Sequence, residues 1–208
     1  DGYGFTSAWL DHIAIQHSVH IIKAAGNINE EHGVTQIPEA SLAQNIITVG
    51  ATDREGELAY YSMYSTLYLK PDICAPGTVY VQYGASMDSY YDDEGMFHER
   101  VLSPERDTVH GTSFASPIVA AIVAQFCQKN STLLVCQDLM KSVLLSGVQD
   151  RGIYSVPGTD EINNFCTAMR WEYGAGVVNA GNSYYVVNYA RWVNSPFYII
   201  ANDVIIAT

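Results

Sequence analysis

The amino-acid sequence predicts an α/β fold in which helices flank a parallel sheet, with a β-rich C-terminal tail. Two observations carry this prediction. Apolar, β-branched runs typical of buried parallel strands alternate with segments of helical periodicity. The chain also has 208 residues, 48% of them hydrophobic, which suffices for about one domain with a sizeable core.

The first half of the chain begins with a predicted helix over residues 7–17, where apolar side chains recur at helical spacing and Ser7 is the expected N-cap. The strands that follow are apolar runs bounded by Gly, Pro or polar clusters. They are predicted at residues 19–25, 46–51 and 72–77, with short edge strands at 60–64 and 67–69.

The second half of the chain contains segments of different composition and predicted structure. Residues 88–107 are acidic and aromatic with little periodicity, so we expect a surface excursion. Two helices are predicted next, a buried one at 114–128 and an amphipathic one at 132–145 closed by Gly147. The tail of residues 183–208 has strand-like runs at 184–189, 197–200 and 204–206.

Charge and composition exclude several classes of partner. Ten basic residues against 22 acidic ones give a net charge of −12, so no basic patch favours nucleic acid. No apolar run reaches membrane-spanning length, and we expect no membrane partner. Four cysteines leave one disulfide and buried free thiols as equal alternatives; they are Cys74, Cys127, Cys136 and Cys166.

The segment with the clearest chemistry places Ser113 at a glycine turn directly before an apolar helix, in the run His110-Gly111-Thr112-Ser113-Phe114-Ala115-Ser116-Pro117. A serine there faces unsatisfied backbone N–H groups and the positive end of the helix dipole, which favour the negative charge of acyl transfer. A simple helix N-cap is the alternative.

This run resembles the Gly-Thr-Ser-x-Ala-x-Pro serine motif of the subtilase family at every fixed position. Four further segments resemble family landmarks in the right order, so the likeness runs from about residue 7 to 180. They are Ala24-Ala25-Gly26-Asn27, residues 47–51, residues 75–77 and the closing Gly-x-Gly-x-x-Asn-Ala segment within 173–180.

The resemblance implies a subtilisin-like fold and a serine endopeptidase acting on polypeptides. Ser113 would be the acyl-forming nucleophile, and Asn27 would donate to the oxyanion together with the backbone N–H of Ser113. Substrate would bind against a wall formed by Ala24, Ala25 and Gly26. Without Ser113 downstream, Asn27 would be read as an ordinary loop amide.

The triad histidine and aspartate motifs of the family are absent from the sequence, as is the substrate-pairing strand expected before Asp1. His110 belongs to the serine motif and is poorly placed as a base. The other histidines lack a motif and are expected to be surface or structural; they are His12, His17, His20, His32 and His98.

The expected organisation is therefore incomplete. Residues 1–182 would be the C-terminal part of a subtilase catalytic domain, and residues 183–208 an extension packed on it. We expect the chain alone to be inactive, and its missing strands to leave a sheet edge for the N-terminal half of the domain or for self-association. The family further implies secretion or another extracytoplasmic location.

No cofactor is expected. The carboxylates of Asp88, Asp92, Asp93 and Glu94 could bind a structural calcium ion, although a solvated acidic loop is the simpler interpretation. Two other functions stay open, a non-catalytic pseudoprotease or scaffold with this fold, and a hydrolase whose base is one of the histidines present.

Overall fold

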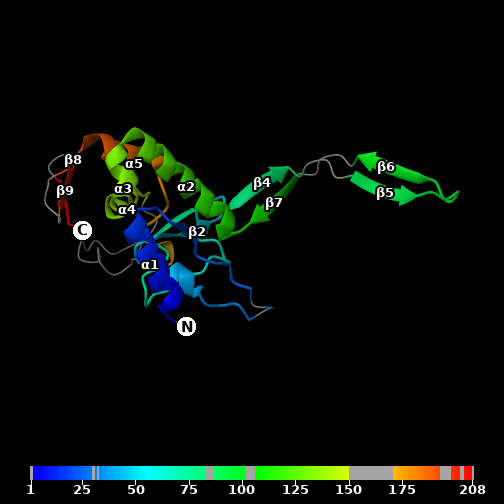
Figure 1. Cartoon of the computed structure of the whole chain (residues 1–208), viewed down its shortest axis with the longest axis horizontal. Coiled ribbons are helices and arrows are strands. Elements are labelled where there is room, and N and C mark those ends of the chain that lie inside the picture. Colours follow the sequence, from blue (N-terminus) through cyan, green and yellow to red (C-terminus); the bar gives the residue numbers. More distant parts are fainter. Residues whose placement is uncertain are drawn as a thin grey trace, which may run out of the picture.

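A computed structural model describes residues 2–29, 31, 33–82, 87–101, 106–149, 171–192, 198–201 and 204–207. Its centre is a parallel sheet of three strands in the order β1-β2-β3 (Figure 1). These are β1 (Ile22–Ala24), β2 (Ile47–Thr52) and β3 (Ile73–Pro76). All six residues of β2 are buried, as its position between two strands requires. The predicted parallel sheet is confirmed, although β1 is shorter than expected.

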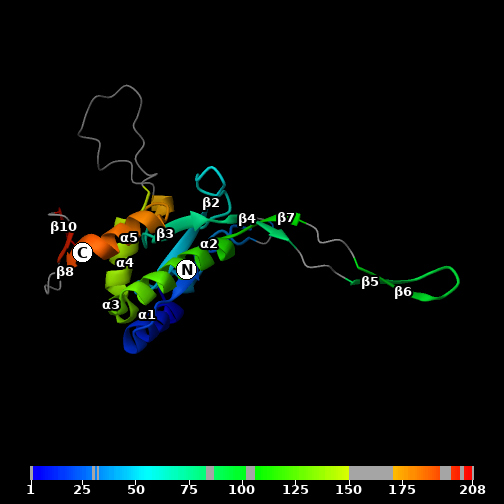
Figure 2. The same ribbon diagram turned by 90° about the horizontal axis from the view of Figure 1, so that it is seen from above.

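Helices cover both faces of this sheet. Ile47 and Val49 of β2 pack in one cluster with Val119 of α2 (Thr112–Lys129). Ile46, directly before β2, packs instead with Ala14 of α1 (Phe5–His17). Because successive side chains of a strand point to opposite faces, α2 and α1 lie on opposite sides of the sheet, with β2 between them in Figure 1. Figure 2 shows the same elements from above. The helix-flanked α/β prediction therefore holds.

The remaining helices extend the α2 face. The predicted helix at 132–145 is two helices, α3 (Ser131–Val135) and α4 (Gln137–Ser146), separated by the extended backbone of Cys136. The run 184–189 is not a strand but part of α5 (Ala180–Tyr189), which packs on α4. Short 3₁₀ helices lie at Glu39–Leu42 and Trp171–Tyr173.

Antiparallel ribbons account for the rest of the described strands. β4 (Thr78–Gln82) pairs with β7 (Arg106–His110), and β5 (Met87–Tyr91) with β6 (Phe97–Val101). Both ribbons project from the body (Figure 1). The surface excursion predicted at 88–107 is thus largely strand, because cross-strand pairs such as Tyr91 with Phe97 replace a core.

Two strand predictions have different outcomes. The tail contains β8 (Ala190–Trp192), β9 (Tyr198–Ala201) and β10 (Val204–Ala207), so its two later runs are confirmed. The edge strands predicted at 60–64 and 67–69 are wrong, because the first range holds only the isolated bridge of Ser62 with Asn27 and the second range is a turn. Among the described residues, no helix is long and apolar enough to cross a membrane.

The start of α1 is capped by a distant side chain. The helix begins at Phe5, so the prediction of Ser7 as N-cap is wrong. Instead the backbone N–H of Thr6 donates to Glu39 Oε1 over 2.7 Å, and Ser7 Oγ donates to the Glu39 carbonyl. A carboxylate at the positive end of the helix does the work of a local cap.

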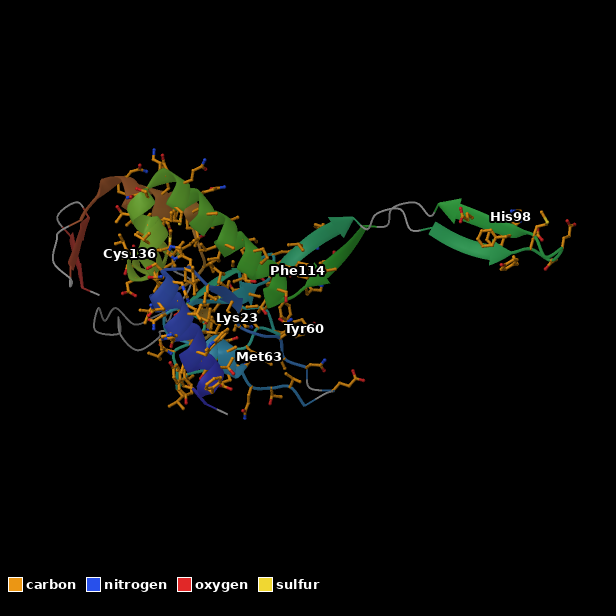
Figure 3. All side chains as sticks on the ribbon, in the orientation of Figure 1. Lys23, Tyr60, Met63, His98, Phe114 and Cys136 are labelled. Carbon is orange, nitrogen blue, oxygen red and sulfur yellow. The ribbon has the colours of Figure 1, made fainter. Side chains whose placement is uncertain are left out.

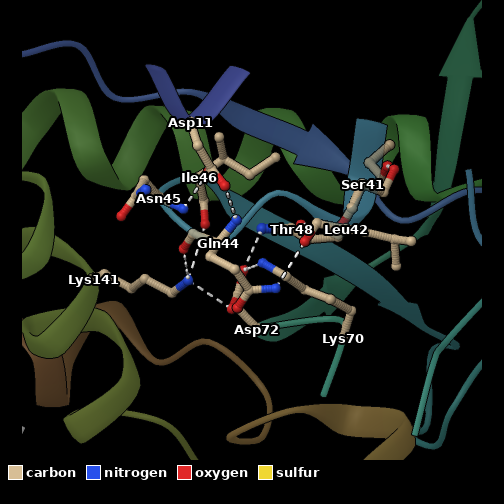
Figure 4. Close-up of polar contacts among 11 residues, drawn as sticks. Asp11, Ser41, Leu42, Gln44, Asn45, Ile46, Thr48, Lys70, Asp72 and Lys141 are labelled. Carbon is tan, nitrogen blue, oxygen red and sulfur yellow. Dashed lines mark hydrogen bonds and ion pairs between the residues drawn. The ribbon is translucent and has the colours of Figure 1, made fainter. Parts of the chain in front are cut away.

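A buried ion cluster ties β3 to its neighbours (Figure 4). Asp72 accepts hydrogen bonds from Lys70 Nζ, Lys141 Nζ and the Thr48 backbone N–H, each over 2.7 Å. Lys70 is fully buried, and burial lowers the pKa of its ammonium group, opposed by the charge of Asp72. Lys141 also donates to the carbonyl of Ile46, so α4 is fastened to the loop before β2.

Candidate active site

Ser113 lies where a strand turns directly into a helix. β7 ends at His110, Gly111 forms the turn, and α2 begins at Thr112. The Gly111 N–H donates to the Gly77 carbonyl over 2.9 Å, which fixes the turn against the end of β3. Ser113 is the second residue of α2 and is exposed, so it lies at the positive end of the helix dipole.

Pro117 removes one backbone hydrogen bond near the start of α2. Because α2 begins at Thr112, Pro117 lies in its second turn, not in the first as a helix start at 114 implied. Proline has no N–H, so it cannot donate to the carbonyl of Ser113, four residues before it. The helical hydrogen-bond ladder is therefore interrupted at the serine itself.

Asn27, which follows β1 in the chain, lies beside the same turn. Its Oδ1 accepts from the backbone N–H of Thr112 over 2.9 Å and from Thr112 Oγ1 over 3.0 Å. Thr112 Oγ1 in turn accepts the N–H of Gly26 over 3.2 Å. The amide oxygen is thus occupied, and Asn27 presents its Nδ2 donor next to Gly111.

Gly111 leaves the space that this amide needs. A side-chain carbon added at Gly111 would lie 3.3 Å from Asn27 Nδ2. The structure therefore places Asn27 against Gly111 and Thr112, the two residues directly before Ser113. A hydroxyl beside a fixed N–H donor is the arrangement that acyl transfer requires.

The residues predicted to form the pocket wall lie at the end of β1, directly before Asn27 in the chain. Ala25 is fully buried in a cluster with Leu42 and Met63, so only its backbone can face a ligand. Gly26 has φ +114°, and a side-chain carbon there would lie 2.8 Å from both Met63 Sδ and Pro38 Cδ. Ala24 is half-buried at the end of β1.

Sequence reasoning missed two residues of this region. Thr112 is a fixed position of the serine motif, and its place next to Ser113 is the only sequence signal for its hydroxyl. Tyr61 had no signal at all, yet its carbonyl accepts the N–H of Ile28 over 2.7 Å. The adjacent Ser62 forms a bridge with Asn27, so the segment 61–63 runs along the Asn27 segment.

No histidine in the described ranges is hydrogen-bonded to Ser113. His110 contacts Thr78 Oγ1 through Nδ1 over 3.1 Å, and His20 contacts the Leu133 carbonyl through Nε2 over 2.6 Å. His98 pairs with Asp92 on the distal ribbon, where Figure 3 shows it far from the body. Within the described part of the chain, the hydrolase with a local histidine base therefore gains no support.

The remaining predicted groups lie apart from this turn. Cys74, Cys127 and Cys136 carry free thiols, whereas Cys166 lies outside the described residues. Burial raises the pKa of Cys74 to about 12. In the described portion, no three His, Cys, Asp or Glu side chains gather as a metal site. Asp92 binds His98, whose hydrogen bond lowers the pKa of that carboxyl, and the side chain of Asp88 lies outside the description.

Comparison with solved structures places the fold among subtilisin-like proteases. The self-cleaved protease domain of PatA superposes with a TM-score of 0.54 and 20% identity, covering 89% of this chain and 57% of that one. The prenylagaramide maturation protease PagA gives a TM-score of 0.57 and 20% identity, with coverage of 90% and 57%. At this identity the likeness shows the fold alone.

The sequence also matches the Subtilase family over residues 1–164. Serine protease AprX of Bacillus subtilis is 32% identical over 170 residues, 77% of this chain and 34% of that protein. A cuticle-degrading serine protease of Arthrobotrys oligospora is 33% identical over 108 residues, 52% of this chain and 21% of that protein. The chain belongs to the subtilase family, and it spans about a third of AprX.

Proposed function

We propose that this chain is the C-terminal part of the catalytic domain of a serine endopeptidase of subtilisin type. One observation carries the proposal. Thr112 holds the amide oxygen of Asn27, which leaves the Nδ2 donor beside the turn that bears the exposed Ser113. Family membership and the serine proteases among its relatives agree with this chemistry.

The reaction follows from the roles of these groups. Ser113 Oγ attacks the carbonyl carbon of the scissile bond while a histidine base takes the hydroxyl proton. The developing oxyanion accepts hydrogen bonds from Asn27 Nδ2 and from the backbone N–H of Ser113. The C–N bond then breaks, the amine leaves with the proton, and water releases the acyl group from Ser113 in a second round.

The histidine and aspartate of the triad come, in this proposal, from an N-terminal segment of the same domain. Two surfaces support its docking. Within the described residues β1 pairs only with β2, so its outer edge has no partner strand. On α1, Phe5 is 83% and Trp9 53% exposed, four residues apart on the face opposite the buried Ala14. The chain alone is then inactive.

The other parts of the proposal rest on the family. The backbone of residues 24–26 forms one wall of the pocket for the substrate side chain before the scissile bond. Residues 183–208 are an extension packed on the domain of residues 1–182. The enzyme acts outside the cytoplasm, which fractionation of cells that produce it would check.

The test is cleavage of an unstructured protein such as casein. The chain is co-expressed with a segment that supplies the aspartate and histidine motifs, alongside Ser113→Ala and the control Ser116→Ala, which removes a hydroxyl one helical turn further on. Cleavage by wild type and Ser116→Ala but not Ser113→Ala supports the proposal. A folded complex without Ser113-dependent cleavage contradicts it and favours the pseudoprotease.

A further inference from the structure

Tyr61 lies between the two segments that carry the proposed catalytic groups. Its carbonyl accepts the N–H of Ile28, the residue after Asn27, over 2.7 Å. Its side chain points the other way and is only 6% exposed. The neighbouring Tyr60 is 87% exposed.

The buried hydroxyl of Tyr61 reaches the turn before the nucleophile. It donates to the Gly77 carbonyl over 3.0 Å, and the same carbonyl accepts the N–H of Gly111 over 2.9 Å. Burial raises the pKa of Tyr61, opposed by hydrogen bonds from Thr78 and from the Gly111 backbone. The hydroxyl is therefore a protonated donor that faces the start of α2.

The Gly77 peptide is tightly packed and hydrogen-bonded between Tyr61 and Gly111. A side-chain carbon at Gly77 would lie 2.5 Å from Ala51 Cβ and 2.7 Å from the Tyr61 hydroxyl oxygen. The Gly77 N–H also donates to the Thr52 carbonyl over 2.9 Å, so the peptide is held from both sides. A shift of the Gly77 carbonyl would therefore move Gly111 and the serine turn with it.

We propose that Tyr61 is a positioning residue that sets the placement of Ser113 relative to Asn27. The inference deepens the proposed function and rests on it. One rigid side chain and its own backbone join the Asn27 segment to the Ser113 turn. Placement matters because an error of about 1 Å between reacting groups can cost about a hundredfold in rate.

The experiment compares Tyr61→Phe with Tyr60→Phe, which removes the same atom from an exposed neighbour. In this chain, we expect the Gly111 amide to exchange its hydrogen several-fold faster in Tyr61→Phe only. In the complex with the N-terminal segment, a fluorophosphonate should label Ser113 with a maximal rate about tenfold lower, the worth of one hydrogen bond. The reagent concentration giving half the maximal rate should not change.

A purely structural role predicts a different pattern. Tyr61→Phe would then unfold at a lower temperature but label at the wild-type maximal rate per folded molecule, which would overturn the inference. Unchanged exchange at Gly111 would overturn it as well, whether or not the complex is active. Failure of the proposed function is recognised separately, because wild type would then label no faster than Ser113→Ala.

Discussion

Thr112 holds Asn27 by two hydrogen bonds, one from its backbone N–H over 2.9 Å and one from its hydroxyl over 3.0 Å. Both end on the same amide oxygen. The first residue of α2 therefore decides which way the asparagine amide points, and Ser113, the proposed nucleophile, is the next residue along the helix. The strand end and the helix start form one unit through this contact.

Replacing Thr112 with valine should loosen this unit while keeping the side-chain shape. The Gly26 N–H and one lone pair of Asn27 Oδ1 would lose their partner, which costs about 1–3 kcal/mol of unfolding free energy. Labelling of Ser113 by a fluorophosphonate in the complex should slow about tenfold. Thr132→Val makes the same change at an exposed position and should do neither. Equal labelling rates for wild type and Thr112→Val would contradict the role of the hydroxyl.

Gly26 should tolerate no side chain. Gly26→Ala meets Met63 and Pro38 at 2.8 Å and also carries the strain of φ +114°. Gly33→Ala is the control, because Gly33 has φ +66° but open space around it. We expect a loss of about 1–2 kcal/mol in unfolding free energy for Gly33→Ala, and about 1–3 kcal/mol more for Gly26→Ala. Urea unfolding measures both, and equal losses would show that crowding is unimportant.

Neutralising Asp72 should leave two lysines without their counter-charge. Lys70 is fully buried and Lys141 is 20% exposed, so water compensates poorly. We expect Asp72→Asn to lower the unfolding free energy by about 3–5 kcal/mol. Asp93→Asn changes an exposed carboxylate in the same way and should alter stability by less than about 0.5 kcal/mol. Similar urea midpoints for the two variants would rule out the cluster as a source of stability.

Cys74 should make the unfolding free energy fall as the pH rises above 9.0. Its pKa is about 12 in the folded chain against 9.0 for a free thiol, so between these values the folded state binds more protons than the unfolded state. Stability from this group is therefore complete below pH 9.0 and is lost as the pH rises toward about 12. Cys74→Ala should flatten this alkaline loss, measured by unfolding at a series of pH values. The control Cys136→Ala should keep the wild-type slope.

Local signals explain which parts of the fold could be predicted. β2, β3 and α2 are apolar runs bounded by Gly, Pro or polar residues, and their apolar side chains are the ones buried in the core. The run 184–189 misled because Tyr and Val favour strands. It is helical because Val187 packs into the core shared with α2 and α4, a tertiary effect that no local pattern contains.

The candidate site likewise has a part that could be predicted from the sequence and a part that could not. The local positions of Ser113 at the start of a helix and of Asn27 after a strand could be predicted, because each residue stands in a recognisable motif. The contacts that orient them could not, since Thr112 and Asn27 are 85 residues apart and Tyr61 meets Gly77 across 16 residues. Helix α1 begins at Phe5 for a similar reason, because its capping carboxylate comes from Glu39, 33 residues beyond Thr6.

The most direct measurement is the rate and position of fluorophosphonate labelling in the complex with the N-terminal segment, for wild type and Asn27→Ala. Mass spectrometry of the peptides should find the adduct on Ser113. Asn27→Ala should label about a hundredfold to a thousandfold more slowly, the cost known for the corresponding asparagine of subtilisin. An adduct on another residue, or equal rates for the two proteins, would contradict an acyl-transfer site built from Ser113 and Asn27.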